Sequence, residues 1–210
     1  LYRELVDAGA SLDAWVATFP ADVARFAPAR ERSLLYRAAT LPRVHVVGAH
    51  KSGKTTLAVA LLEALAARGL SVGSVKHTRD AYDTDAAGTD SQRLYAAGAS
   101  PVVFVSGRRT GVHARHDGEP TLDAVIAREM PHVDVVVVEG FRDRPGPKVE
   151  VCREATGREP VAADDPEVIA VVADRPTPHA SSVPRFPLGG IDGLLPVVLG
   201  GLGLGSLLNL

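Results

Sequence analysis

The residues with the clearest chemical meaning form one glycine-rich segment. The pattern G-x-x-x-x-G-K-[ST] of a phosphate-binding loop is matched by Gly48-Ala49-His50-Lys51-Ser52-Gly53-Lys54-Thr55. The match lies between an expected strand, 44–47, and an expected helix, 55–67. This context is what the chemistry requires, because the loop and the first helical turn point unpaired N–H groups at phosphates. The segment therefore predicts a nucleotide site.

Individual positions of this loop have distinct expected roles. Lys54 is expected to reach the β and γ phosphates and to act catalytically, and the Thr55 hydroxyl to take a Mg²⁺ coordination position. Gly48 and Gly53 permit the turns that point backbone N–H groups inward. Lys51 either adds charge near the phosphates or faces solvent. The other loop positions expected to contact the nucleotide are His50, Ser52 and Thr56.

Further candidate groups follow two of the expected strands. An acid that holds Mg²⁺ is expected at the end of the strand beside the phosphate-loop strand. Glu139 fits as metal ligand and catalytic residue, since it follows four valines. Lys76 and His77 end the strand 71–75, which we also expect beside the phosphate-loop strand. There Lys76 would contact the nucleotide, and His77 would orient a water or contact a phosphate, unless it is a surface histidine.

Two other carboxylates are candidates with competing roles. Asp90 is expected either to bind Mg²⁺ or, with Ser91, to cap the helix 90–97. The chain contains no Asn-Lys-x-Asp stretch, the usual reader of guanine. Asp174, just beyond the strand 168–172, is therefore our candidate acceptor for the guanine N1–H and N2–H₂ donors.

Positioning these groups requires strands that alternate with helices. Periodicity predicts helices at 55–67, 90–97 and 122–129, and strands at 44–47, 71–75, 101–105, 133–138, 148–152 and 168–172. Unbroken apolar runs such as 133–138 are typical of buried parallel strands, and right-handed crossovers place each helix over a face of the sheet. We therefore expect an α/β fold of the P-loop NTPase type, a mostly parallel sheet with helices on both faces.

The two ends of the chain have different expectations. Residues 1–40 are predicted to be a short helical N-terminal segment, an extension of unassigned role, and residues 41–210 the P-loop nucleotide-binding domain. The uncharged run 193–210 has the length of a membrane span. Because it contains several glycines and Pro196 and has no flanking Lys or Arg, we expect a buried final strand or helix and a flexible tail.

Composition limits the classes of partner and compartment. The 210 residues allow one compact domain with an appendage. With 23 Lys+Arg against 25 Asp+Glu, no sequence-wide basic field exists to attract nucleic acid. The single cysteine, Cys152, cannot form an internal disulfide or a zinc site built from cysteines alone, and it suits a reducing compartment. Since we see no signal peptide either, we expect a cytoplasmic protein with no nucleic-acid or membrane partner.

Four motifs, taken in order, resemble the MobB family of molybdopterin-guanine dinucleotide biosynthesis adapter proteins. They are the loop 46–56, the segment Val75-Lys76-His77-Thr78 with Gly88-Thr89-Asp90-Ser91, then Val138-Glu139-Gly140-Phe141, and Pro147-Lys148-Val149-Glu150-Val151. The resemblance covers residues 43–174. It implies a GTP-binding P-loop protein, usually a homodimer, that assists the guanylyltransferase MobA in attaching GMP to molybdopterin. It also implies slow hydrolysis.

Two functional interpretations remain open from the sequence. The first is a nucleotide-dependent adapter with weak GTPase activity, because no arginine finger and no water-orienting glutamine is assignable. The alternative is a small-molecule kinase or an ATP-dependent ligase on the same fold, with the loop 78–88 as its acceptor site. GTP preference would favour the adapter, and ATP preference the alternative. The excursion 107–118 and the apolar segment 194–199 are candidate interface material for a dimer.

Overall fold

The computed structural model describes residues 41–78 and 88–209. The chain divides into two compact units, one of residues 1–41 and 121–132 and the other of residues 42–120 and 133–210. In the first unit the described structure is helix α5 (Leu122–Glu129), which Thr121 caps through a hydrogen bond from the Ala124 N–H. The predicted helical segment 1–40 and most of the loop 78–88 lie outside the described residues.

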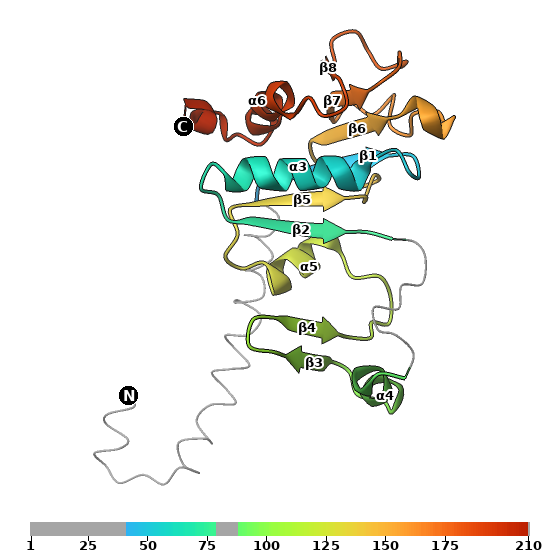
Figure 1. Ribbon diagram of the computed structural model, residues 1–210, viewed down its shortest axis with the longest axis vertical. Helices are drawn as coiled ribbons and strands as arrows, with labels where there is room; N and C mark the ends of the chain where they lie inside the picture. Colours follow the sequence, from blue (N-terminus) through green and yellow to red (C-terminus); the bar gives the residue numbers. More distant parts are fainter. Residues whose placement is uncertain (1–40, 79–87, 210) are drawn as a thin grey trace, which may run out of the picture. The chain divides into compact units, whose positions relative to one another are not determined.

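A six-stranded sheet forms the centre of the second unit, with the order β2-β5-β1-β6-β7-β8 (Figure 1). All of its pairings are parallel. Its strands are β1 (Arg43–Gly48), β2 (Val72–Lys76), β5 (Val135–Glu139), β6 (Lys148–Cys152), β7 (Val168–Ala173) and β8 (Arg185–Phe186). The predicted α/β class with a mostly parallel sheet is confirmed, and the short strand β8 is an addition that the sequence did not indicate.

The position of β2 differs from the prediction. We expected β2 directly beside β1, but β5 lies between them. The physical reason lies in the burial patterns: every residue of β5 is buried, whereas exposure alternates along β2. A strand that is apolar on both faces takes a central place, and a half-exposed strand takes an edge. Because β5 pairs with β1, Glu139 does end a strand beside the phosphate-loop strand.

The expected strand 101–105 does not belong to this sheet. It forms β3 (Val102–Val105), which pairs antiparallel with β4 (Thr110–His113) in a separate two-stranded sheet. The prediction that it continues the parallel alternation was wrong, and the excursion expected at 107–118 contains the second strand of this hairpin. Val103 and Val105 are exposed on β3, so this strand has the one-sided burial of a hairpin and not that of a central parallel strand.

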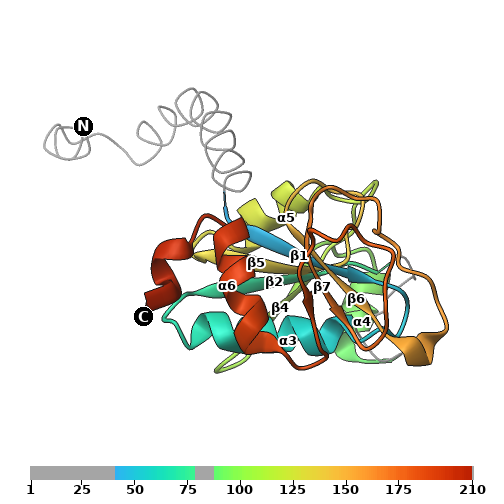
Figure 2. The ribbon, with the colours of Figure 1, turned by 90° about the horizontal axis from the view of Figure 1, so that it is seen from above.

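Two helices cover one face of the sheet. Figure 2 shows α3 (Lys54–Ala66) and α6 (Ile191–Gly201) on the same side of the strands. Leu57, Leu61 and Leu65 of α3 recur every four residues, so they form one stripe, and this stripe joins the buried core with Leu194 and Val198 of α6. Burying each such side chain stabilises the fold by about 1.5–3 kcal/mol.

A smaller core lies on the opposite face of β1, β6 and β7. It contains Val47, Cys152 and Val171 from the strands and Ala162 from the connection after β6. Val183, from the connection after β7, packs against it. These two connections, 153–167 and 174–184, therefore cover the strands on a face where none of the described helices of the second unit lies.

The apolar C-terminal run forms a buried helix, one of its two expected forms. Leu194, Leu195, Val198 and Leu199 of α6 are buried, and a short 3₁₀ helix, Gly205–Asn209, follows. Within residues 41–78 and 88–209, no helix is both long enough and apolar enough to cross a membrane.

A buried lysine joins β6 to the connection that follows it. The Lys148 ammonium group, 2% exposed, lies 2.7 Å from the Glu167 carboxylate and 2.9 Å from that of Asp165. Burial by itself lowers the pKa of Lys148, but these hydrogen bonds outweigh it and hold the pKa above its ordinary 10.5. The bond from Lys148 lowers the pKa of Glu167; for Asp165, burial raises the pKa but the same lysine brings it below the ordinary value.

This triad predicts a pH range for its contribution to stability. The two carboxyl groups have lower pKa values in the folded than in the unfolded chain, so their ionised forms stabilise the fold at pH values above the unfolded pKa. The pKa of Lys148 is raised on folding, so its charged form stabilises the fold at pH values below 10.5. The contribution is thus complete from about pH 5 to about pH 10 and is lost as the pH falls below that range or rises above it. The free energy of unfolding can be measured with urea from pH 3 to pH 7. It should fall less steeply towards acid pH in Lys148→Met than in the wild type. Parallel curves for the two proteins would contradict this role.

Candidate functional site

The phosphate loop turns between the end of β1 and the start of α3. Gly48 has φ +145°, and a Cβ there would lie 2.5 Å from the Val151 carbonyl oxygen and 2.7 Å from the Ser52 hydroxyl. Gly53 is the N-cap of α3 in the left-handed region, with φ 101° and no side-chain capping bond. The N–H groups of the first turn of α3 therefore remain available to an anion, as the loop pattern predicts.

Two lysines converge on the loop. The Lys54 ammonium group donates to the carbonyl oxygens of Gly48, at 3.1 Å, and Ala49, at 2.7 Å. The Lys76 ammonium group lies 3.1 Å from Glu139 Oε1, because the register pairs these two residues across β2 and β5. Burial lowers the pKa of Lys54, the Glu139 carboxylate raises it, and the Lys76 charge lowers it further. A phosphate group would supply the anion that two adjacent ammonium groups require.

Thr55 and Glu139 meet directly. The Thr55 hydroxyl donates to Glu139 Oε2 at 2.8 Å, and Lys76 Nζ lies 3.4 Å from the same hydroxyl. In an octahedral Mg²⁺ site, with Mg–O distances of about 2.1 Å, neighbouring ligand oxygens are about 3 Å apart. The two oxygen atoms already have that spacing, so this pair of residues fits the ion that the sequence predicts.

The other loop positions divide into exposed and enclosed groups. His50 and Lys51 are exposed, and contact of either residue with a nucleotide stays a prediction. Ser52 is buried, and its hydroxyl has no hydrogen-bond partner among the described residues. Thr56 lies at the edge of an apolar cavity of about 200 Å³ beside the loop. The cavity is also lined by Ser52, Gly53, Leu57, Ala60, Val151, Arg153, Val172, Leu188, Gly189 and Ile191.

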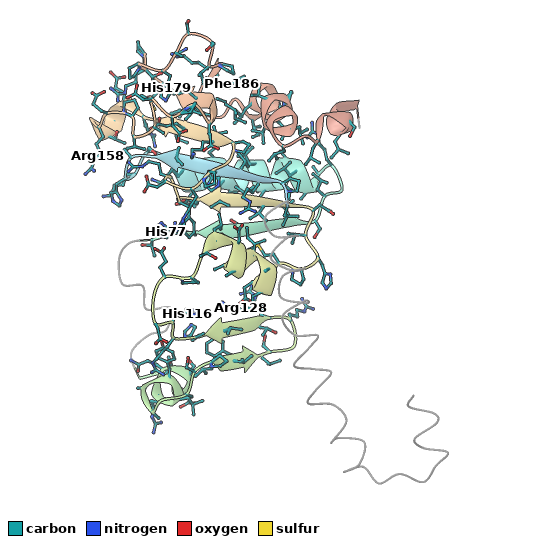
Figure 3. All side chains as sticks on the ribbon, turned by 180° about the vertical axis from the view of Figure 1, so that it is seen from behind. His77, His116, Arg128, Arg158, His179 and Phe186 are labelled. Atoms are coloured by element: carbon teal, nitrogen blue, oxygen red, sulfur yellow. The ribbon has the colours of Figure 1, made fainter. Side chains whose placement is uncertain are left out.

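The His77 ring lies in a second cavity at the carboxyl ends of the strands (Figure 3). Its Nε2 atom is 2.5 Å from Glu119 Oε1, and its ring stacks on Phe141 with centroids 4.3 Å apart. The cavity has a volume of about 590 Å³ and continues along Arg142 and Arg144. Sequence reasoning missed Glu119 and the two arginines as neighbours of His77. Only the position of Phe141 directly after Glu139-Gly140 indicated that an aromatic group follows the strand end.

The helix cap expected from Asp90 and Ser91 is formed by a neighbouring residue. Thr89, not Asp90 with Ser91, is the N-cap of α4 (Asp90–Ala96), because its extended backbone lets the hydroxyl accept the Gln92 N–H. The Asp90 side chain is 98% exposed and lies 3.7 Å from Arg93 one turn later. Binding of Mg²⁺ by Asp90 stays a prediction.

Asp174 holds two chain segments together at the end of β7. Its Oδ1 atom accepts the Glu154 N–H at 2.7 Å, which fixes the short turn after β6. Since parallel strands end at the same edge of the sheet, Asp174 and the phosphate loop both lie at the carboxyl edge, with β6 between their strands. Binding of a base by Asp174 stays a prediction.

Comparison with known proteins gives one consistent result. Residues 43–174 match the family described as MobB, molybdopterin guanine dinucleotide synthesis protein B. The molybdopterin-guanine dinucleotide biosynthesis adapter protein of Escherichia coli is 34% identical over 152 residues, which cover 70% of this chain and 86% of that protein. The protein of the same name from Haemophilus influenzae is 31% identical over 137 residues, covering 65% and 76%.

Solved structures agree with this family match. A MobB homologue from Bacillus stearothermophilus superposes with a TM-score of 0.56 and 26% identity, over 77% of this chain and 98% of that one. Bacillus subtilis MobB superposes with a TM-score of 0.58 and 25% identity, over 74% of this chain and 97% of that one.

Proposed function

This chain belongs to the MobB family of molybdopterin guanine dinucleotide synthesis proteins, and we propose that it is a GTP-binding adapter in the biosynthesis of molybdopterin-guanine dinucleotide, the nucleotide form of the molybdenum cofactor. The observation that carries the proposal is the convergence of Lys54, Lys76, Thr55 and Glu139 on one phosphate loop. The kinase or ligase alternative is not favoured, since the relatives named above are adapter proteins.

In this proposal each group of the loop has a binding role. The N–H groups from Gly48 to Thr55 surround the β phosphate, and Lys54 exchanges its two carbonyl partners for phosphate oxygens. Thr55 and Glu139 hold Mg²⁺, which supplies charge neutralisation for the β and γ phosphates. Lys76 stays near the γ phosphate because Glu139 fixes its position across the register.

The same proposal places the nucleoside on the β6 and β7 side of the loop. The apolar cavity that begins at Thr56 is bounded there by Val151 and Val172, and apolar walls suit a base and ribose. Asp174 follows β7 at that edge. In this proposal its carboxylate accepts the N1–H and N2–H₂ donors that guanine has and adenine lacks.

The base preference tests this function. We expect GTP to bind at least about 10-fold more tightly than ATP in the presence of Mg²⁺, because hydrogen bonds to a charged acceptor contribute about 1.5–3 kcal/mol. Asp174→Asn should remove that preference while leaving ATP affinity unchanged, since an amide oxygen still accepts the Glu154 N–H. Calorimetric titration of GTP and ATP into the wild type and Asp174→Asn, at one salt concentration, measures the ratio of the two affinities.

The comparison with Asp174→Ala separates base recognition from loop positioning. If the preference is lost only in Asp174→Ala, the aspartate acts through the turn at Glu154 and another group reads the base. Tighter binding of ATP than GTP by the wild type would overturn the adapter proposal and favour the kinase or ligase.

Hydrolysis and partners complete the proposal. We expect intrinsic GTP hydrolysis of the order of 10⁻⁴ to 10⁻³ per second, the scale of an unassisted GTPase. In this proposal the protein partner is a MobA-type guanylyltransferase, and molybdopterin is the molecule to which that enzyme attaches GMP. We place the function in the cytoplasm, whose reducing conditions suit the free, buried Cys152.

A homodimer formed through the β3–β4 hairpin is part of the same proposal. The register puts Val103 opposite Val112, and Val105 lies two residues from Val103 on the same face. All three side chains are exposed, Val105 by 77%. A two-stranded hairpin is marginally stable by itself and has two edges that lack a neighbouring strand. A second copy of the chain would cover the valines and pair with an edge.

Val105→Glu is expected to convert the dimer into monomers, because the new carboxylate would be buried without a partner. Sedimentation equilibrium at micromolar concentrations measures the dissociation constant of the dimer, which should rise more than 100-fold. Val59→Glu places the same charge on an exposed valine of α3 and should leave the dimer intact. A wild type that is monomeric in this range, or an equally tight Val105→Glu dimer, would contradict the proposed interface.

A further inference from the structure

A cluster of potential metal ligands lies in the smaller core, on the face of the sheet opposite α3. Glu150 and Cys152 are two residues apart on β6, so their side chains project from the same face. Val149 and Val151, which alternate with them, pack in the core beneath α3 and α6. His179 comes from the connection between β7 and β8 (Figure 3). Ligand atoms of the three clustered residues all lie within 4.8 Å of one another.

The cluster is shielded from solvent and contains an oriented carboxylate. Glu150, Cys152 and His179 are 0%, 4% and 5% exposed. Glu150 accepts the N–H groups of Val161 and Ala162, and its Oε2 atom lies 2.7 Å from His179 Nε2. Hydrogen bonds of this kind hold carboxylate and imidazole ligands in position around metals in proteins. These bonds hold the carboxylate and the imidazole side by side before any ion binds.

The imidazole of His179 faces Glu150 through its Nε2 atom. Nε2 lies 2.7 Å from Glu150 Oε2, so an ion held by Nε2 could also reach the carboxylate. When the ring proton is on Nδ1, the Nε2 lone pair is available to such an ion. Nδ1 is buried and has no hydrogen-bond partner in the part of the chain that the structure describes, so no acceptor there fixes the ring proton on one nitrogen.

A reactive free thiol does not explain the arrangement. The Cys152 side chain is 4% exposed, so oxidants and electrophiles in solvent do not reach its sulfur. Coordination to a divalent cation would use the sulfur as a thiolate, because a coordinated thiol gives up its proton.

We propose that Glu150, Cys152 and His179 form a Zn²⁺-binding site. The ion would take one carboxylate oxygen, the Cys152 thiolate and one imidazole nitrogen, a mixed donor set that suits zinc. The thiol proton passes to solvent, so a thiolate and a carboxylate balance the two positive charges. Zinc–ligand distances of about 2.0–2.3 Å require the ligand atoms to settle roughly 3.3–3.7 Å apart in a tetrahedral site, and the fourth position is left for water.

Zinc at this site would fasten the connection 174–184 to the end of β6. It would also stabilise the region around Asp174, which begins that connection. The site does not depend on the proposed nucleotide function, and its test reads the metal directly.

Cobalt is the spectroscopic probe for this site. Co²⁺ titrated into the full, untagged and metal-free chain should bind in one equivalent and produce a thiolate-to-cobalt charge-transfer band together with the visible bands of a four-coordinate ion. Cys152 is the only cysteine, so this band can have no other source. Zn²⁺ should displace the cobalt, abolish both sets of bands and raise the melting temperature of the wild type.

Three variants decide the assignment. Cys152→Ser, a small change that retains the fold, should lose the charge-transfer band, and His179→Gln should weaken Co²⁺ binding at least about 10-fold. His116→Gln, an exposed histidine outside the cluster, should bind as the wild type does. Absence of a charge-transfer band in the wild type, or equal affinity in His179→Gln, would overturn the site. Circular dichroism of each variant establishes that its fold is intact.

Discussion

Lys54→Ala is expected to weaken GTP binding at least about 100-fold, or about 2.7 kcal/mol. In the structure Lys54 donates to the carbonyl oxygens of Gly48 and Ala49 inside the loop, so its ammonium group already lies where phosphates bind. Its removal takes away a charge-assisted bond to the triphosphate from a partly buried group, and such bonds are about twice as strong as neutral ones. Calorimetry with Mg²⁺ and GTP measures the loss.

Controls distinguish this effect from a general loss of positive charge. Arg93→Ala removes an exposed arginine charge on α4 and should change GTP affinity by less than about twofold. Lys54→Arg keeps the charge but replaces a compact ammonium by a wider planar group, and should still lose most of the affinity. GTP binding by Lys54→Ala at wild-type strength would mean that the loop does not hold the triphosphate.

Gly48→Ala is expected to destabilise the protein by about 3 kcal/mol and to abolish nucleotide binding. The new Cβ would lie 2.5 Å from the backbone carbonyl of Val151 on β6, which cannot move without disturbing the central sheet. The φ of +145° adds strain that only glycine avoids. For a chain of this length the loss corresponds to a melting temperature lower by about 6–12 °C.

Two other glycines separate the contributions of the collision and the backbone strain. Gly69 has φ +78° and open space around its Cα, so Gly69→Ala reports strain alone and should cost about 1 kcal/mol. Gly107 has neither a positive φ nor a neighbour within 4 Å, and Gly107→Ala should be neutral. If Gly48→Ala lowers the free energy of unfolding by no more than Gly69→Ala does, the close approach to Val151 does not destabilise the protein.

Two features were predictable from the sequence because they depend on local spacing. The loop from Gly48 to Thr55 needs only a turn between a strand and a helix, and one stretch of chain provides it. Glu139 could be placed as well, since four valines before it predict a buried central strand whose end is an established position for polar groups. The α/β class follows from the same alternation of apolar runs and helical periods.

Features that depend on which strands become neighbours were not predictable in this way. The place of β2 at the edge and the departure of β3 into a hairpin were set by competition among strands for buried positions. Thr89 caps α4 although Asp90 and Ser91 beside it are also able to cap a helix, and the order of such residues along the chain does not reveal which one does so.

The segment from Lys148 to Cys152 shows the difference most clearly. The sequence identified part of it as a motif that resembles a family pattern, but not what its polar side chains do. The tertiary structure buries Lys148 beside Asp165 and Glu167, and places Glu150 and Cys152 against His179. By itself the sequence determined the phosphate loop, the position of Glu139 at a strand end beside it and the parallel sheet, because those depend on neighbours along the chain. Only folding decided the partners of buried charges, because those residues are distant in sequence and meet through packing.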